Sequence, residues 1–340
     1  MQAEIPNIAG EGIPKIFDVS AVNFVETALT VFRYQYQNIP VYRQFTDALS
    51  VSPEQVRKIE QIPFLPIRFF KTHNIAQSNI MPEVVFESSG TTQSLNSKHY
   101  VQSLNIYRQS FLSAFKAFYG NIRDWCIIGL LPSYLERNNS SLVVMVDELV
   151  TQSQHADSGF YLYEHEKLYQ LLQDLEKRGQ KTLLIGVTFA LLDFAEKYNL
   201  DLKNTVVMET GGMKGRREEW TREQVHAFLS ERLSVSEIHS EYGMTELLSQ
   251  AYSGGNGMFN CPSWMKILLR DEDDPMVVHD APPKTEKSKT GIINVIDLAN
   301  IYSCSFIATD DVGRLYPDGG FEVLGRVDNS DIRGCSLMVL

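Results

Sequence analysis

The sequence is poor in cysteine and lacks long apolar runs. Its 340 residues hold four widely separated cysteines, with no C-x-x-C pair and no histidine at metal-ligand spacing: Cys126, Cys261, Cys304 and Cys335. This pattern indicates neither a disulfide framework nor a zinc site. No cationic segment followed by an apolar run opens the chain, and no stretch approaches the ~18 apolar residues that span a membrane. We therefore expect reduced thiols, a cytoplasmic location and no membrane insertion.

Positive charge is also scarce. Lysine and arginine number 31 against 42 aspartates and glutamates, which gives a formal net charge of −11. An acidic chain is a poor partner for nucleic acid or an anionic membrane, although a local basic site for a small phosphate remains compatible. The P-loop spacing G-x-x-x-x-G-K-[ST] and the G-x-S-x-G nucleophile elbow are both missing. A P-loop hydrolase is therefore disfavoured, as is a thioesterase or acyltransferase that acts without ATP.

The apolar residues make up 44% of the chain, enough for a large core in one big domain plus a smaller one. The first hundred residues have a mainly helical pattern. Apolar side chains recur at helical spacing at Phe24, Ala28, Phe32 and Tyr36. The stretch 52–55, SPEQ, supplies an N-cap, an N1 proline and a capping-box partner, so it predicts the start of another helix.

From about residue 103 helices and strands alternate. A helical pattern ends before Gly120, and then apolar runs typical of buried strands (126–132, 182–187, 204–209) alternate with helical segments (166–179, 221–233). This alternation predicts an α/β fold with a large mixed or parallel sheet and flanking helices. Beyond residue 255, strands with turn-rich links predict a small antiparallel β subdomain. We expect an α/β core with N-terminal helices at 1–255, the β subdomain at 256–325 and a hinge-like tail at 326–340.

Three loops contain polar groups that suit a nucleotide, and ligands of open α/β sheets lie beyond the carboxyl ends of strands. Residues 88–92, SSGTT, place hydroxyls and backbone amides around a glycine, with Lys98 nearby, as a phosphate site requires. Residues 210–212, TGG, would let a flat ring lie close to the backbone. Residues 241–246, EYGMTE, offer an aromatic ring, a hydroxyl and a carboxylate for Mg²⁺. Taken singly, each loop is better explained by solvation or packing.

Together with two later motifs, these loops resemble a known pattern. The motifs SSGTT at 88–92, EYGMTE at 241–246, TDD at 309–311 and GRVD at 325–328 follow the order and rough intervals of the signature motifs of the adenylate-forming superfamily, which includes acyl-CoA synthetases. From about residue 60 onward the chain most resembles the acyl-protein synthetase (LuxE) family, through the stretches at 63–74, 130–149, 261–266 and 293–311. The resemblance implies the N-terminal domain of the adenylate-forming fold, with the mobile C-terminal domain absent.

The resemblance also implies residue roles in a ligase that uses ATP and Mg²⁺. The implied nucleotide-binding residues are Ser88, Ser89, Gly90, Thr91, Thr92, Gly211, Gly212, Tyr242, Gly243, Asp311 and Arg326, and the implied catalytic residues are Thr245, Glu246, Lys98 and Cys335. The 88–92 loop and Lys98 would hold the β- and γ-phosphates, and the two glycines would border an adenine covered by Tyr242.

The remaining implied roles concern the α-phosphate, the metal and the ribose. Thr245 would touch the α-phosphate and Glu246 would hold Mg²⁺. Asp311 would bind the ribose hydroxyls, helped by Arg326, and Asp328 would be the hinge residue. Two departures from the superfamily pattern stand out: Gln93 replaces a glycine of SSGTTG-x-P-K, and the lysine comes two places late. Without the C-terminal domain's lysine, the adenylation cation would be Lys98, Arg137 or Arg326, or would come from a partner protein.

The function implied is activation of a carboxylic acid, most simply a fatty acid, to an acyl adenylate, followed by transfer to a thiol on a partner protein, a carrier or the enzyme itself. In LuxE-type synthetases the acceptor is a cysteine near the C-terminus, which here matches Cys335, and Arg333 would lower its pKa. One alternative is a ligase that charges coenzyme A or an acyl carrier protein. Another is a catalytically incomplete nucleotide-binding subunit that needs a partner chain. The acyl chain, the acceptor and the oligomeric state are left open.

Several other residues have two interpretations. Cys126 and Cys304 lie in apolar runs and are expected in the core, whereas Cys261 either packs or lines an acyl pocket. We expect His99 to be a solvated loop side chain rather than a phosphate ligand, and His239 to be a satisfied histidine at a strand end. The polar residues of 134–138 follow a strand, where they suit either a ligand or a buried ion pair.

Overall fold

The computed structural model describes residues 15–78, 80–88, 95–132, 139–211 and 220–327. Its helices are α1 Phe24–Asn38, α2 Pro40–Ala48, α3 Phe69–Thr72, α4 Leu104–Tyr119, α5 Ser141–Ser153, α6 His165–Lys177, α7 Thr188–Lys197 and α8 Arg222–Leu233. The first strands are β1 Leu65–Pro66, β2 Val84–Glu87, β3 Lys98–Val101, β4 Cys126–Leu130, β5 Gly159–Phe160, β6 Thr182–Gly186, β7 Thr205–Thr210 and β8 His239–Tyr242. The later strands are β9 Ala251–Ser253, β10 Phe259–Asn260, β11 Met265–Arg270, β12 Val278–His279, β13 Lys289–Asp297, β14 Phe306–Leu315 and β15 Phe321–Arg326.

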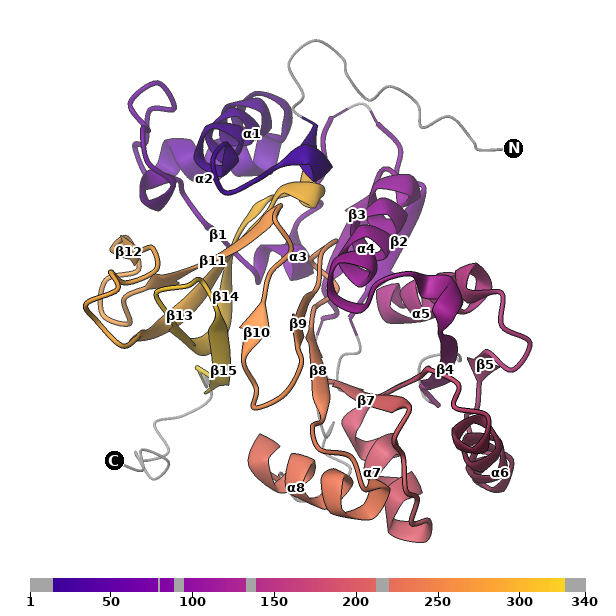
Figure 1. Ribbon diagram of the computed structural model, residues 1–340. Helices are drawn as coiled ribbons and strands as arrows, with labels where there is room; N and C mark the ends of the chain where they lie inside the picture. Colours follow the sequence, from indigo (N-terminus) through magenta and orange to yellow (C-terminus); the bar gives the residue numbers. More distant parts are fainter. Residues whose placement is uncertain (1–14, 79, 89–94, 133–138, 212–219, 328–340) are drawn as a thin grey trace.

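Most strands form a single mixed sheet (Figure 1). Its order is β12-β11-β13-β14-β15-β10-β9-β8-β7-β6-β4-β5, with β1 added beside β14. The strands from β5 to β8 run parallel, and those from β8 to β12 pair antiparallel. The hairpin β2-β3 is a separate two-stranded sheet. The predicted α/β fold class, with a large mixed sheet, flanking helices and antiparallel strands in the last third, is confirmed.

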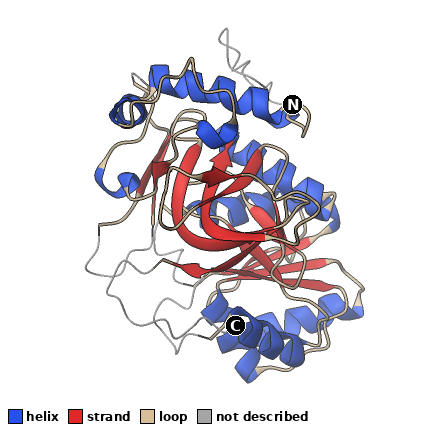
Figure 2. Cartoon of the chain, turned by 90° about the vertical axis from the view of Figure 1, so that its left-hand side faces the viewer, coloured by secondary structure: helices blue, strands red, loops and turns tan. Residues whose placement is uncertain are grey.

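The strands and helices predicted after residue 103 form where the apolar periodicity and the capping residues indicated. The runs at 126–132 and 182–187 become β4 and β6, whose residues are all buried, as parallel strands with helices on both sides require. Figure 2 shows helices on both sides of the strands. Helix α4 ends at Gly120, whose φ of +86° is costly for any other residue. A capping box from Thr221 and Gln224 opens α8.

The prediction that 52–55 starts a helix is wrong. The stretch forms a turn, with the Gln55 amide donating to the Ser52 carbonyl at 2.9 Å. The downstream residues Val56 and Ile62 are both buried. Pro63 then follows, and proline disfavours helical geometry at the residue before it. The chain therefore bends into the core instead of continuing as a surface helix, and short strands share the first hundred residues with the helices.

The boundary predicted between the core and the β subdomain falls between β9 and β10. These two strands are hydrogen-bonded neighbours, with Phe259 opposite Ser253. The division at residue 255 stays a prediction. No helix in the described part of the chain is long and apolar enough to cross a membrane.

Candidate active site

Two residues from separate motifs, Tyr242 and Arg326, meet at a third motif residue, Asp311. The Tyr242 hydroxyl, at the end of β8, donates to Asp311 Oδ2 at 2.8 Å. Arg326 is the last residue of β15, and its Nε donates to Asp311 Oδ1, also at 2.8 Å. Asp311 is 5% exposed, whereas 73% of the Arg326 side-chain surface is exposed. A buried carboxylate therefore connects β8 to β15, and its partner Arg326 is exposed to solvent.

The backbone around Asp311 is fixed from the strand behind it. The Asp311 amide donates to Thr309 Oγ1 at 3.1 Å, and the same hydroxyl donates to the Ile293 carbonyl at 2.8 Å. The Arg270 guanidinium donates to the Thr309 carbonyl at 2.5 Å. Asp311 and Arg326 are opposite residues of the β14-β15 pair, next to an irregularity in the register at Val312. Such irregularities re-aim side chains at functional sites.

Tyr242, the last residue of β8, packs against aromatic side chains of β10 and β15. Its ring is 8% exposed and meets Phe321 at 5.5 Å and Phe259 at 6.0 Å between centroids. Burial and the neighbouring Asp311 carboxylate raise the pKa of its hydroxyl. The tyrosine therefore stays neutral and donates its proton to Asp311. Its predicted role of covering an adenine ring stays a prediction, and its hydroxyl is committed to the aspartate.

Glu246 lies in the segment between β8 and β9 and is 6% exposed. Burial raises the pKa of its carboxyl, while the Ser97 hydroxyl and the charges of Arg326 and Lys71 act in the opposite direction. Ser97 in turn is joined to Ser88, since the Ser97 amide donates to Ser88 Oγ at 2.9 Å and the Ser88 amide donates to the Ser97 carbonyl at 3.0 Å. The base of the predicted phosphate loop thus lies beside Glu246.

Several predicted site residues lie outside the described residues: Ser89, Gly90, Thr91, Thr92, Arg137, Gly212, Asp328 and Cys335. Gly211 directly follows β7 and has a φ of +47°, a left-handed conformation that favours glycine. A Cβ on Gly243 would overlap Glu241 Oε1, so any side chain there would force the Glu241 carboxylate to move. Burial raises the pKa of Glu241 to about 7, against a hydrogen bond from Thr210 that lowers it.

Lys98 is the first residue of β3 and faces Glu87 across the hairpin. Its Nζ lies 3.4 Å from Glu87 Oε1, and both side chains are partly exposed. The charge of Lys98 is therefore shared with a carboxylate. Lys71 of α3 was not predicted from the sequence, yet its charge reaches Glu246 and it is exposed. The only pointer to Lys71 in the sequence was its place in the family-like stretch 63–74.

The expectation that His99 is a solvated side chain is wrong. Its ring is fully buried, with Nδ1 2.9 Å from the Thr245 carbonyl and Nε2 2.8 Å from Ser303 Oγ. The Phe70 ring meets it edge-on at 5.6 Å. Burial lowers the pKa of His99 to about 4, so the ring is neutral at neutral pH. The polar residues next to His99 in the sequence suggested a loop, but His99 belongs to strand β3 and its side chain is buried.

The other histidine and the cysteines behave as expected. His239 begins β8, and its Nδ1 lies 3.1 Å from the Tyr119 hydroxyl, so it is a satisfied histidine at a strand end. Cys126 and Cys304 are fully buried in the core. Cys261 is partly buried and packs against the core. Among the described cysteines, burial raises the pKa of both core thiols, which makes them poor nucleophiles.

The described residues offer few ligands for a metal ion. Within the described residues, no three His, Cys, Asp or Glu side chains form a group that could hold a metal. Mg²⁺ in nucleotide sites is bound by one or two carboxylates, with phosphates and water completing the shell, so Glu246 alone fits this requirement. One small pocket among the described residues lies beside His99, and its enclosed space is far smaller than the ~300 Å³ of the smallest usual ligand sites.

Solved structures resemble this chain in part. A luciferase-like enzyme from the mealworm Zophobas morio is 17% identical with a TM-score of 0.49, over 75% of this chain and 60% of that chain. A long-chain-fatty-acid-CoA ligase from Archaeoglobus fulgidus is 14% identical with a TM-score of 0.45, over 72% and 51%. O-succinylbenzoate coenzyme A synthetase from Bacillus subtilis, in complex with ATP and magnesium, is 16% identical with a TM-score of 0.47, over 74% and 51%.

These three matches cover between 51% and 60% of the length of the solved chains. A comparison with curated protein sequences found no match. The family model of the acyl-protein synthetase LuxE matches residues 19–340, which include every motif described above. The chain belongs to the LuxE family of acyl-protein synthetases.

Proposed function

We propose that this protein activates a carboxylic acid with ATP and transfers the acyl group to a thiol. The observation that carries the proposal is the convergence of Tyr242, Asp311 and Arg326, three motif residues far apart in the sequence, at one hydrogen-bonded point. Glu246 lies within the electrostatic reach of Arg326 and beside Ser97 at the base of the 88–97 loop. Family membership supports the same chemistry.

In the first step a carboxylate oxygen of the acid attacks the α-phosphorus of ATP. The new bond is O–P, the bond to the β-phosphate oxygen breaks, and pyrophosphate leaves. Negative charge develops at phosphorus, so the site's task is to position the groups and stabilise charge. The Thr245 hydroxyl would contact the α-phosphate, and Glu246 would hold Mg²⁺. Asp311 would accept hydrogen bonds from the ribose hydroxyls. When bound, Mg²⁺ would neutralise phosphate charge.

The cation for this step would come from the two positive side chains whose charges reach Glu246. Arg326 is half of the ion pair with Asp311 yet remains mostly exposed, and Lys71 is exposed on α3. Lys98 is the weaker candidate because Glu87 already lies 3.4 Å from its Nζ. A cation near the phosphates favours the anionic transition state over the ground state.

In the second step a thiolate sulfur attacks the acyl carbonyl carbon. A C–S bond forms, the C–O bond to phosphate breaks and AMP leaves, while the thiol proton passes to solvent. We propose Cys335 as the first acceptor, a thiol of a partner protein or carrier as the next, and a fatty acid as the substrate. The described core cysteines are unsuited to this role because burial keeps them protonated. The alternatives are direct charging of coenzyme A or an acyl carrier protein, or a nucleotide-binding subunit that is inactive alone.

Pyrophosphate exchange tests the activation step. The purified protein with ATP, Mg²⁺, labelled pyrophosphate and a panel of fatty acids should form labelled ATP only when an acid is present. Glu246→Gln should lower the exchange rate by about 10²-fold or more, because it removes the carboxylate that would hold the charge-neutralising Mg²⁺. Glu231→Gln, at an exposed position on α8, is the matched control and should leave the rate unchanged. Nucleotide binding without exchange for any acid would favour the incomplete-subunit alternative.

Mass spectrometry of the intact protein tests the acceptor. After incubation with ATP, Mg²⁺ and the best acid, we expect one added acyl group that disappears in Cys335→Ala and persists in Cys261→Ala. Acyl transfer that survives Cys335→Ala, or release of AMP only when coenzyme A is added, would support the direct-charging alternative instead.

A further inference from the structure

The segment Thr245–Ser249 is held in place by side chains from elsewhere in the chain. It follows β8, carries Thr245 and Glu246, and forms neither helix nor strand. One backbone hydrogen bond inside this region, from the Leu247 amide to the Met244 carbonyl at 3.1 Å, is too little to fix its shape. Three buried side chains hydrogen-bond to its backbone: His99 of β3, Asp297 at the end of β13 and Asn300 just after it. We refer to these three residues as the cradle.

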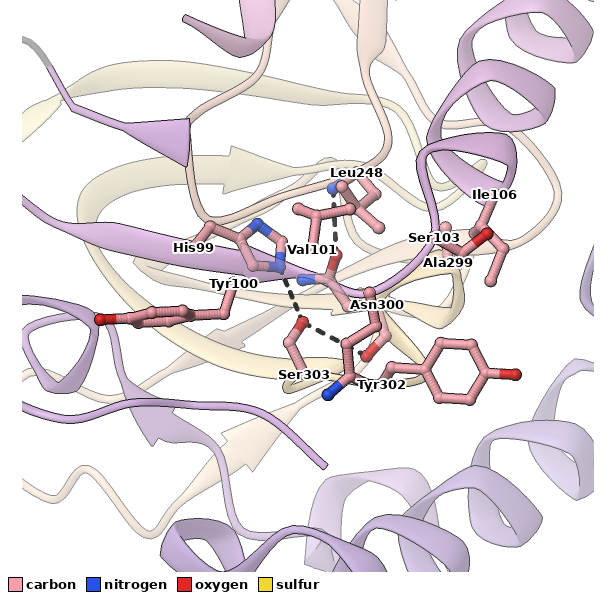
Figure 3. A pocket seen from close by; sticks show the side chains of 11 residues that line it. His99, Tyr100, Val101, Ser103, Ile106, Leu248, Ala299, Asn300, Tyr302 and Ser303 are labelled. Carbon is pink, nitrogen blue, oxygen red and sulfur yellow. Dashed lines mark hydrogen bonds between the residues drawn. The ribbon is translucent and has the colours of Figure 1, made fainter. Parts of the chain in front are cut away.

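Asp297 and Asn300 bind the second half of the segment. Asp297 Oδ2 accepts from the amides of Leu248 and Ser249, each at 2.9 Å, and its Oδ1 accepts from the Ser249 hydroxyl at 2.6 Å. Asn300 Oδ1 accepts from the Leu248 amide at 3.1 Å. Figure 3 shows this contact between Leu248 and Asn300.

Asn300 also reaches back toward the first half of the segment. Its Nδ2 donates to the Glu246 carbonyl at 2.7 Å and to the Cys304 carbonyl at 3.0 Å. Both amide protons and the oxygen of Asn300 are therefore used. Asp297 and Asn300 are 0% exposed, and buried polar groups of this kind are retained only when their partners are complete.

His99 binds the Thr245 end. A carbonyl oxygen only accepts, so His99 Nδ1 carries the proton and donates to the Thr245 carbonyl at 2.9 Å. The other ring nitrogen then accepts from the Ser303 hydroxyl at 2.8 Å, as drawn in Figure 3. The Ser303 contact satisfies the second ring nitrogen, and the Thr245 contact holds the backbone of the residue that carries the candidate α-phosphate hydroxyl.

We propose that His99 is a positioning residue for acid activation, which sets the backbone of Thr245 and thereby the directions of the Thr245 hydroxyl and the Glu246 carboxylate. The inference rests on the proposed function, since those two groups matter only if the nucleotide is bound there. It also assigns a role to the family-like stretch 293–311, which contains the other two cradle residues. A shift of about 1 Å in a positioned group is enough to lower a rate by 10²-fold.

Two substitutions of His99 separate positioning from packing. In His99→Asn the amide nitrogen stands near the place of Nδ1 and can still donate to Thr245. In His99→Gln the amide lies near the place of Nε2, so it can reach Ser303 but not Thr245. Both lose the buried ring, and both should be less stable. We expect His99→Asn to keep kcat for pyrophosphate exchange within tenfold of wild type, and His99→Gln to lose about 10²-fold per folded molecule.

The matched control is Ser303→Ala, which removes the partner of Nε2 and leaves the Thr245 contact in place. We expect it to keep wild-type kcat. Equal kcat for the Asn and Gln variants, once corrected for the folded fraction by near-ultraviolet circular dichroism, would overturn the inference. A Gln variant with full activity would do the same.

ATP binding supplies a readout that does not depend on turnover. Calorimetry of ATP with and without Mg²⁺ should show at least a tenfold gain in affinity from the metal in wild type and His99→Asn, and little gain in His99→Gln. If the wild-type protein binds ATP but catalyses no exchange, the proposed activity is wrong. The effect of Mg²⁺ on ATP affinity in the His99 variants would still test the role of His99. Wild type that binds no ATP at all would overturn both.

Discussion

Single buried carboxylates connect the parts of the candidate site. Asp311 joins Tyr242 to Arg326, and Asp297 accepts four hydrogen bonds around the Thr245–Ser249 segment and the turn after β13. Burying a carboxylate is costly unless it is paired or hydrogen-bonded. Glu241 differs from these two, since the bond described for it comes from the Thr210 hydroxyl at 2.6 Å and the charges near it are negative.

The first prediction concerns the pH dependence of stability at Glu241. Its folded pKa of about 7 lies above its ordinary value of 4.5, so the folded state binds more protons between these values. Protonated Glu241 therefore adds to the free energy of unfolding. This contribution is fully present below about pH 4.5 and is lost as the pH rises through 7, and it amounts to at most about 3 kcal/mol. Glu241→Gln keeps an acceptor for Thr210 and should flatten the urea-unfolding free energy between pH 5 and 8. Parallel curves for the variant and wild type would contradict this.

The second prediction concerns the glycine of the EYGMTE motif. A Cβ on Gly243 would overlap Glu241 Oε1, which cannot turn away easily because Thr210 holds the other oxygen. Gly243→Ala should therefore lower the unfolding free energy by about 1–3 kcal/mol. Glu241→Ala removes the overlapping atom, so the double variant should be more stable than the sum of the single effects predicts. Gly254→Ala, with its nearest atom at 3.8 Å, is the control and should change little; additive effects would refute the overlap.

At the scale of elements, the N-terminal helices are fastened to the last third of the chain. Gln35 of α1 is fully buried and donates from Nε2 to the Asn300 and Ile301 carbonyls at 2.9 and 3.1 Å. Its Oε1 accepts from the Ser305 amide at 3.0 Å. Strand β1 adds to β14, and the Ile67 amide donates to the Ala308 carbonyl at 2.9 Å. Helix α1 therefore supports the turn that carries the cradle residue Asn300.

The third prediction tests this attachment. Gln35→Met keeps the side-chain length but leaves buried carbonyls and one amide without partners, at about 1–3 kcal/mol for each buried group that stays unpaired. We expect a loss of about 3 kcal/mol in the free energy of unfolding, measured in urea. Gln37→Met, on the exposed side of the same helix, should change it by less than about 0.5 kcal/mol. Equal effects of the two variants would show that the buried amide contributes nothing.

Element prediction succeeded where the pattern was local. The strands β4 and β6 were evident from apolar runs, and the end of α4 was evident from Gly120, because these depend on neighbours along the chain. The prediction failed at 52–55. The capping sequence there favours a helix, but Val56 and Ile62 are buried in the core. Tertiary burial outweighs a capping preference worth about 1 kcal/mol.

At the scale of the whole molecule, the sheet is continuous from β5 to β12. Strand β8 pairs with β9, β9 with β10 and β10 with β15, so the sheet passes without a break from the strands before residue 255 to the strands after it. The Tyr242–Asp311 contact also crosses this boundary. Later strands therefore cover the β9 edge of the predicted core at 1–255, and β14 pairs with its strand β1.

The fourth prediction is that residues 1–255 do not fold alone. An unpaired β9 edge and the loss of β14 beside β1 would expose apolar surface and backbone groups. We expect the fragment to lack a cooperative unfolding transition and a dispersed amide NMR spectrum, and to regain both when expressed together with 256–340. A cooperative transition of the isolated fragment would instead support two independent domains.

The sequence by itself determined the α/β class, most strands after residue 103 and the family, because apolar periodicity and short motifs are properties of neighbouring residues. It also named Tyr242, Asp311 and Arg326 as partners of one ligand. Only the tertiary structure decided that Asp311 is the shared acceptor of the other two and that His99 is buried against Thr245. It also decided that the charge of Lys71 reaches Glu246, whereas Lys98 is paired with Glu87. Apart from the Lys98–Glu87 pair, these interactions join residues between 15 and 175 positions apart. Their geometry follows from strand order and register, which no local pattern contains.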